Sequence, residues 1–240
     1  MFASQVRSAL PYKILAGVEP CAGGWLVAPG NLQGVNLAPQ PAFVLASMAE
    51  VLDYKPAFTV VALHSPVGFT DKPGEQRSCD EAARHLLGPR GTAVVPAPSR
   101  ALLGAKTFDQ ARAVEPGIDA VRWRALAKMA EAAGQVQSWN QRTVWEVHPE
   151  LAFCQMNGGQ PVAYPRRSVL GRAERARLVC SALAGAERVL SEPPKGVREA
   201  KLIDALADLW TARRIAARAI TRTAPDPVWD SEGLRMDIVF

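Results

Sequence analysis

Three short apolar segments separated by turn residues near the N-terminus constrain the fold of this chain most strongly. Lys13 to Glu19 reads KILAGVE, Trp25 to Ala28 reads WLVA, and Leu32 to Leu37 completes the series. The segments are separated by Gly23-Gly24 and by Pro29-Gly30-Asn31, and residues of these types interrupt strands at tight turns. The pattern predicts that the fold opens with a three-strand antiparallel meander.

The segments after the meander alternate between helix and strand patterns. Between Pro41 and Asp53, apolar residues recur at helical spacing, which predicts a first helix. Phe58 to Leu63 reads FTVVAL, a continuous apolar run of the kind that forms a strand buried on both faces. Further helices are predicted at Arg77–Leu87, Phe108–Ala113, Trp123–Ala133, Gly171–Leu190 and Arg198–Arg222, with a turn through Pro225 to Pro227 and a last strand at Arg235–Phe240. This order predicts one compact α/β domain with a mixed sheet flanked by helices.

The stretch Val144 to Phe153, VWEVHPELAF, holds the densest group of candidate functional residues. Glu146, His148 and Glu150 occupy every second position among apolar and aromatic residues, and side chains two apart share one face of an extended strand. Pro149 ends regular ladder pairing. Charges in so apolar a strand require a metal ion, a partner charge or a water-filled cleft. The stretch therefore predicts one wall of a site.

His64 is a second candidate, because it follows the buried FTVVAL strand directly. In open α/β sheets, ligands bind at the carboxyl ends of strands. The sequence therefore places an imidazole at the edge of the sheet where a site is expected.

Composition narrows the class of protein. The four cysteines are scattered without metal-ligand spacing, which favours reduced thiols in a cytoplasm over a disulfide framework. No apolar run reaches the eighteen or so residues of a membrane span, and the N-terminus lacks the apolar core of a signal peptide. We therefore expect a soluble cytoplasmic protein with no membrane partner. The net charge of +5 favours polyanions only modestly.

Seven motifs resemble those of domain-of-unknown-function family 429, whose members are described as predicted ribonuclease H-like nucleases. The motifs span nearly the whole chain in the right order, and EVHPELAF is the most specific of them. They are GVEPCAGGW (17–25), HSPVGF (64–69), RSCDEAAR (77–84), VPAPSR (95–100), EVHPELAF (146–153), LIDALADLWTA (202–212) and DSEGLRMDIVF (230–240). The resemblance implies a single ribonuclease H-like domain over residues 1–240.

The resemblance also implies a metal-dependent phosphodiesterase, a nuclease-like hydrolase acting on nucleic acid. In that chemistry, carboxylates hold two Mg²⁺ or Mn²⁺ ions about 4 Å apart. Glu19 takes the position of the family's first acid, usually Asp, and Asp204 keeps the acid of the last helix. The acid after the fourth strand falls on His64, and the acidic pair ahead of Asp204 falls on Ala200 and Lys201.

These departures bear on the metal. Imidazole is a poor ligand for Mg²⁺ but a good one for Mn²⁺, Zn²⁺, iron or nickel, and Lys201 places a positive charge where a second ion would otherwise bind. The expected cofactor is a divalent metal, Mn²⁺ or Mg²⁺ first, with another transition metal as the alternative. The predicted metal ligands are Glu19, His64, Glu146, His148, Glu150 and Asp204, and the predicted catalytic residues are Glu19, Glu146, His148 and Asp204.

Each candidate also has a purely structural alternative. Glu19 could begin a turn, His64 could cap one, Glu146 could pair with an arginine, and His148 could sit in a buried hydrogen-bond network. At about 100° per residue, Asp204 points nearly away from the apolar stripe of its helix, as a solvent-exposed acid would. Two other functions therefore stay open: a catalytically inactive relative that binds nucleic acid or a protein partner, and a hydrolase of a small phosphorylated metabolite.

Overall fold

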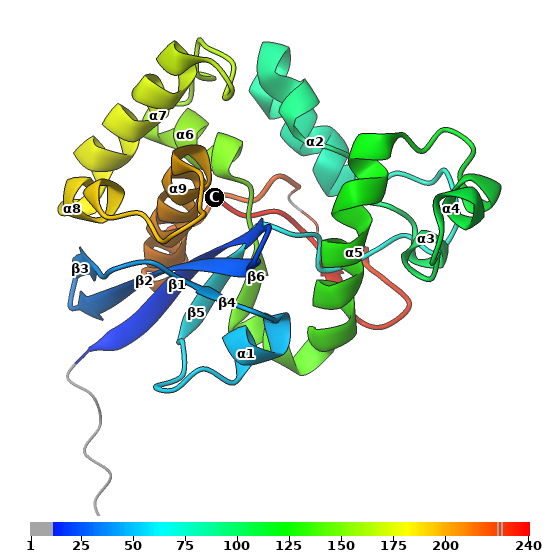
Figure 1. The fold of residues 1–240 in the computed structure, drawn as a ribbon, viewed down its shortest axis with the longest axis horizontal. Coiled ribbons are helices and arrows are strands. Elements are labelled where there is room, and N and C mark those ends of the chain that lie inside the picture. The colour runs from blue at the N-terminus through cyan, green and yellow to red at the C-terminus, as the bar shows by residue number, and fades with distance from the viewer. Residues whose placement is uncertain (1–11, 225, 227) are drawn as a thin grey trace, which may run out of the picture.

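The computed structural model describes residues 12–224, 226 and 228–240, and its centre is a mixed β-sheet (Figure 1). In the described residues the sheet has the order β3-β2-β1-β5-β6, and β4 pairs with β2. β1 is antiparallel to β2 and parallel to β5, which is parallel to β6. The strands are β1 (Lys13–Cys21), β2 (Gly24–Gln33), β3 (Asn36–Pro39), β4 (Phe43–Leu45), β5 (Val60–Leu63) and β6 (Val144–Glu146), with a separate pair β7 (Val228–Trp229) and β8 (Arg235–Met236).

Helices cover the sheet, and none in the described residues is long and apolar enough to cross a membrane. The α-helices are α1 (Met48–Leu52), α2 (Ser78–Leu87), α3 (Arg100–Leu103), α4 (Phe108–Val114), α5 (Ala120–Gln135), α6 (Pro149–Met156), α7 (Val169–Ala182), α8 (Ala186–Ser191) and α9 (Glu199–Ala216). The 3₁₀ helices are η1 (Gly88–Ala93) and η2 (Ser138–Arg142).

Helix α9 is the core helix of the molecule. It packs against β1, β2 and β5 on one side, and α6, α7 and α8 contact it on the other. Every residue from Leu202 to Ala212 is buried, because sheet and helices together enclose its whole circumference. A second apolar core lies on the opposite face of the sheet, where Met48 and Val51 of α1 meet Ala132 of α5.

Gly17 in β1 sets how closely α9 approaches the sheet. A Cβ atom at this position would lie 2.9 Å from the carbonyl carbon of Asp208, and the backbone of Ala205 and Leu209 is closer still. Only glycine leaves room for this approach. The close contact brings the polar residues of α9 beside the carboxyl end of β1.

The predicted meander is confirmed, but one of its predicted turns is wrong. Pro29-Gly30-Asn31 lies inside β2 and pairs with β1, and the chain turns instead at Gly34, whose φ is +60°. Gly30 serves packing, because a Cβ there would lie 2.8 Å from the side chain of Leu37. A glycine needed for close approach gives the same sequence signal as one needed for a turn.

Several predicted element boundaries also need correction. The segment from Pro41 to Asp53 forms β4 and the five-residue α1 rather than one helix, and Gly185, with φ +89°, separates α7 from α8 within the predicted helix 171–190. The predicted strand at 235–240 is shorter, with Val239 making only isolated bridges. The turn predicted through Pro225 to Pro227 includes two residues outside those described.

The stretch from Val144 to Phe153 changes structure in its middle. Its strand, β6, ends at Glu146, and α6 begins at Pro149 with His148 as N-cap. Proline fits the first turn of a helix, where its missing N–H is not needed. The alternating pattern therefore does not put Glu146, His148 and Glu150 on one strand face, and Glu150 belongs to a helix.

Candidate metal centre and its cavity

Glu19 lies at the centre of a buried polar cluster at the carboxyl end of β1. Its side chain is fully buried, His64 Nδ1 lies 2.5 Å from Oε1, and Lys201 Nζ donates to Oε2 at 2.5 Å. The backbone N–H of His64 donates to Val18 O at 2.9 Å, which holds the imidazole beside Glu19. Burial alone raises the pKa of Glu19, but the charges of His64 and Lys201 outweigh burial and hold this pKa well below its ordinary value.

Helix α9 contributes three polar side chains to this region. Lys201, Asp204 and Asp208 are three and four residues apart, which places them on one face of the helix. Asp204 and Asp208 are both buried. We refer to Glu19, His64, Lys201 and Asp208 as the Glu19 cluster.

No donor reaches either carboxylate oxygen of Asp208 among the described residues, although both atoms are buried. Burial, then the negative charges of Glu19 and Asp204, and a side-chain hydrogen bond with Glu19 raise the pKa of Asp208 well above its ordinary value, so the neutral acid is favoured unless a cation is bound. Buried polar atoms almost always have a partner, and a bound cation can serve as the partner of a buried acid. Ionised Asp208 therefore needs a cation beside it, whereas the neutral acid can donate to Glu19.

Glu19, His64 and Asp208 have the spacing of ligands to one ion. One ligand atom from each lies within 4.8 Å of the others, and two ligands on opposite sides of an ion at about 2.1 Å would be roughly 4.2 Å apart. The 2.5 Å contact between His64 Nδ1 and Glu19 Oε1 would open, and the most distant ligand atoms would move slightly closer, when one ion binds all three side chains. Two carboxylates and one imidazole suit Mn²⁺, Fe²⁺ or Zn²⁺ better than Mg²⁺. The donor set thus fits a single divalent transition metal.

Asp204, a predicted ligand, is adjacent to the cluster but engaged by Arg166. Arg166 Nε donates to Asp204 Oδ2 at 2.6 Å. Burial, and then the charge of Glu19, raise the pKa of Asp204 to about 6 even though Arg166 lowers it. The solvent-exposed alternative for Asp204 is wrong, because α6 and α7 cover the outer side of α9.

Glu146 is held by an arginine rather than presented for a metal. Arg77 donates to both of its oxygens, at 2.6 and 2.9 Å, and the N–H of Val67 donates to Oε2 at 2.9 Å. Arg77 also binds Asp80, and all three charged side chains are buried. Burial lowers the pKa of Arg77, but the charges of Glu146 and Asp80 raise this pKa by more than burial lowers it. The guanidinium therefore stays charged. The triad fixes the loop after β5.

Glu150 and His148 also have structural partners. Arg175 donates to both oxygens of Glu150, at 2.7 and 2.8 Å. The Nδ1 atom of His148 accepts from the N–H of Glu150 at 3.2 Å, and the ring meets His64 edge-on with centroids 4.7 Å apart. Burial, and then the charge of His64, lower the pKa of His148 to about 3, so this imidazole is neutral. Of the six predicted ligands, the structure gathers Glu19 and His64 around the carboxyl group of Asp208.

Asp208 is the residue that sequence reasoning missed. It lies inside the LIDALADLWTA motif, four residues after Asp204, and i, i+4 acids share one helix face. That spacing was the available signal.

A cavity of about 670 Å³ lies beside the Glu19 cluster, and it is lined by His64 and Lys201 but not by Glu19 or Asp208. His64, Lys201 and His148 lie in its lining, with α5 residues on the opposite wall. The cavity therefore gives a ligand access to the carboxyl ends of β1, β5 and β6.

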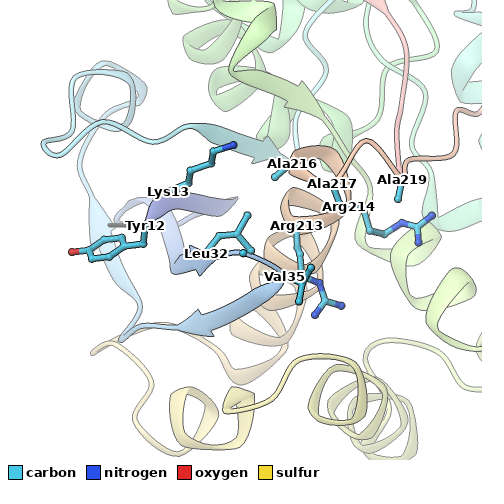
Figure 2. A pocket seen from close by; sticks show the side chains of 10 residues that line it. Tyr12, Lys13, Leu32, Val35, Arg213, Arg214, Ala216, Ala217 and Ala219 are labelled. Atoms are coloured by element: carbon cyan, nitrogen blue, oxygen red, sulfur yellow. The ribbon is translucent and has the colours of Figure 1, made fainter. Parts of the chain in front are cut away.

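A second cavity of about 860 Å³ lies at the opposite end of β1 (Figure 2). Its wall includes Tyr12, Lys13, Val35 and the C-terminal arginines of α9, Arg213 and Arg214. No acid or histidine is among its described lining residues. Although it is larger, this cavity has no carboxylate or imidazole among its described lining residues to bind a metal ion, so we place the candidate site at the Glu19 cluster.

Comparison with known proteins gives one match. No curated protein and no solved structure matches the chain significantly. The sequence model of a family described as "Protein of unknown function (DUF429)" matches residues 17–228, which include all residues of the Glu19 cluster. The chain belongs to the DUF429 family.

Proposed function

We propose that this protein is a divalent-metal-dependent phosphodiester hydrolase, nuclease-like in type, that acts on nucleic acid. The observation that carries the proposal is the buried Asp208 carboxyl group, which no basic group reaches among the described residues. It lies beside Glu19 and His64, and His64 of the same cluster lines a cavity at the sheet edge. A buried acid without a partner is unfavourable unless an ion or a function requires it.

The order of the strands supports the same proposal. Three antiparallel strands are followed by β5 and β6 parallel to β1, in the order β3-β2-β1-β5-β6. This order supports a ribonuclease H-like arrangement, in which metal-binding acids come from strand ends and from the last helix. Glu19 and Asp208 have those two origins. We therefore assign the domain to the ribonuclease H-like class as part of the proposal.

Glu19, His64 and Asp208 would hold the metal. A bound divalent ion supplies charge stabilisation at a phosphoryl oxygen and a more acidic bound water. Lys201 donates to Glu19 Oε2, so this carboxylate oxygen is already paired with the ammonium group. Because Lys201 also lines the cavity, its fixed charge is placed to attract a phosphate. The cluster therefore combines a single-ion donor set with a built-in cation.

Thermal unfolding with and without Mn²⁺ tests the metal site. At an ion concentration 100 times the Kd, binding to the folded state stabilises it by about 2.7 kcal/mol. For a chain of this size that corresponds to roughly 5–10 °C in Tm. We expect Mn²⁺ to raise the Tm of the wild type by this amount. We expect no Mn²⁺-induced shift in Asp208→Asn or in Glu19→Gln, because each variant lacks a proposed ligand.

Asp119→Asn is the matched control. Asp119 is an exposed N-cap of α5, and asparagine caps equally well, so this variant should keep the full shift. If millimolar Mn²⁺, Zn²⁺ and Mg²⁺ all leave the wild-type Tm unchanged, the metal-dependent proposal fails. Cleavage of end-labelled DNA and RNA with the stabilising ion then tests the reaction itself, with Asp208→Asn as the inactive reference.

A further inference from the structure

We infer that the cavity beside the Glu19 cluster accepts a single unpaired nucleotide unit, with its phosphate towards Lys201 and its base against an apolar wall. The inference rests on the proposed function and narrows its substrate to single-stranded ends or free nucleotides rather than intact duplex.

The size of the cavity is the first observation. At about 670 Å³ it falls within the range of pockets that enclose one small organic molecule. Helix α5 forms one wall and the segment Gly196–Arg198 contributes to the rim. A base pair within a duplex cannot enter a space of this size unless a base leaves the stack. The volume therefore favours a unit that is already unpaired.

Charge is the second observation. The two acids in the lining, Asp80 and Glu146, are both bound by Arg77. Arg124 and Arg198 are exposed at the same cavity. The lining therefore presents an excess of positive charge, which suits the phosphate of a nucleotide.

The apolar part of the lining is the third observation. Val95 and Val121 are 42% and 55% exposed, and both belong to the cavity wall. They come from separate elements, the loop after η1 and the first turn of α5. With the partly buried Met129 they offer an aliphatic surface to a flat apolar group. Exposed aliphatic side chains beside cations match the two chemical parts of a nucleotide, its base and its phosphate.

Fluorescence anisotropy in EDTA tests this inference independently of the metal. The probes are a labelled single-stranded oligothymidylate and a blunt duplex that contains the same strand. We expect the single strand to bind at least tenfold more tightly, and thymidine 5′-monophosphate to displace it more effectively than inorganic phosphate. Displacement by the free nucleotide would indicate recognition of one unit, whereas equal binding of duplex and single strand would overturn the inference.

Variants locate the binding surface. Arg124→Ala combined with Arg198→Ala should weaken single-strand binding about tenfold or more, and Val121→Asp should weaken it comparably by opposing both base and phosphate. Arg177→Ala is the control, because Arg177 is an exposed arginine of α7 outside the cavity lining. All substituted residues are exposed, and unchanged Tm values would verify folding. Unchanged affinity in both cavity variants would refute the site, whether or not Mn²⁺ stabilises the protein.

Discussion

Replacing Gly17 with alanine should separate the core helix from the sheet. The added Cβ would lie 2.9 Å from the carbonyl carbon of Asp208 and closer to the backbone of Ala205 and Leu209, within a spacing that real Cβ atoms essentially never show. Overpacking a core costs about 1–3 kcal/mol when side chains can move aside. Here the opposing atoms belong to the backbone of a helix buried on all sides, so we expect about 3 kcal/mol.

The same displacement should loosen the metal site. Asp208 is on α9 and Glu19 is two residues after Gly17 on β1, so a wider gap moves the two carboxylates apart. Mn²⁺ affinity should therefore fall along with stability.

Urea unfolding and Mn²⁺ calorimetry measure the two effects of Gly17→Ala. Gly117→Ala is the control, because no heavy atom lies within 4 Å of a Cβ at that position and the substitution reduces only the entropy of the unfolded chain. A Gly17→Ala protein within about 0.5 kcal/mol of the wild type, with unchanged Mn²⁺ affinity, would refute the reasoning.

Three further predictions concern other charged and titratable groups. Arg77→Met leaves Asp80 and Glu146 buried without their partner and should lower the free energy of unfolding by about 3–5 kcal/mol, as measured by urea unfolding. A loss below about 1 kcal/mol would contradict this prediction. Burial raises the pKa of the Cys79 thiol to about 12, so its stability contribution is present below the unfolded pKa of about 8.5 and is lost as pH rises towards 12. Cys79→Ala should therefore lose less stability than wild type between about pH 9 and 11, as denaturation at several pH values would show. Lys201→Gln removes the positive charge beside Glu19 and should lower the Mn²⁺ Kd about fivefold to tenfold. An unchanged Kd by calorimetry would contradict the placement of the ion close to Lys201.

Elements with long or strongly apolar patterns were predictable from sequence. The meander, the buried strand β5 and the helices α2, α5 and α9 follow directly from periodicity and turn residues. The errors fall where one residue type has two uses. Gly30 allows close packing instead of a turn, and His148-Pro149 starts a helix instead of ending a strand.

The candidate site was only partly predictable, because sequence shows which acids exist but not which arginines reach them. Glu146 and Glu150 are separated in sequence by 69 and 25 residues from the arginines that bind them, and nothing local marks these pairs. The burial of Asp204 and Asp208 was hidden for a related reason. An amphipathic pattern assumes one solvent-facing side, and α9 has none over Leu202–Ala212.

The packing of α9 on β1 also has a consequence for synthesis on the ribosome. Glu19 and Lys201, which join the two elements, are 182 residues apart, and at about 5–20 residues per second the ribosome needs roughly 9–36 s to make the intervening chain. During that interval the face of β1 that α9 will cover has no partner from α9. The nascent protein therefore depends on its environment to keep that face from aggregating until the last helix emerges.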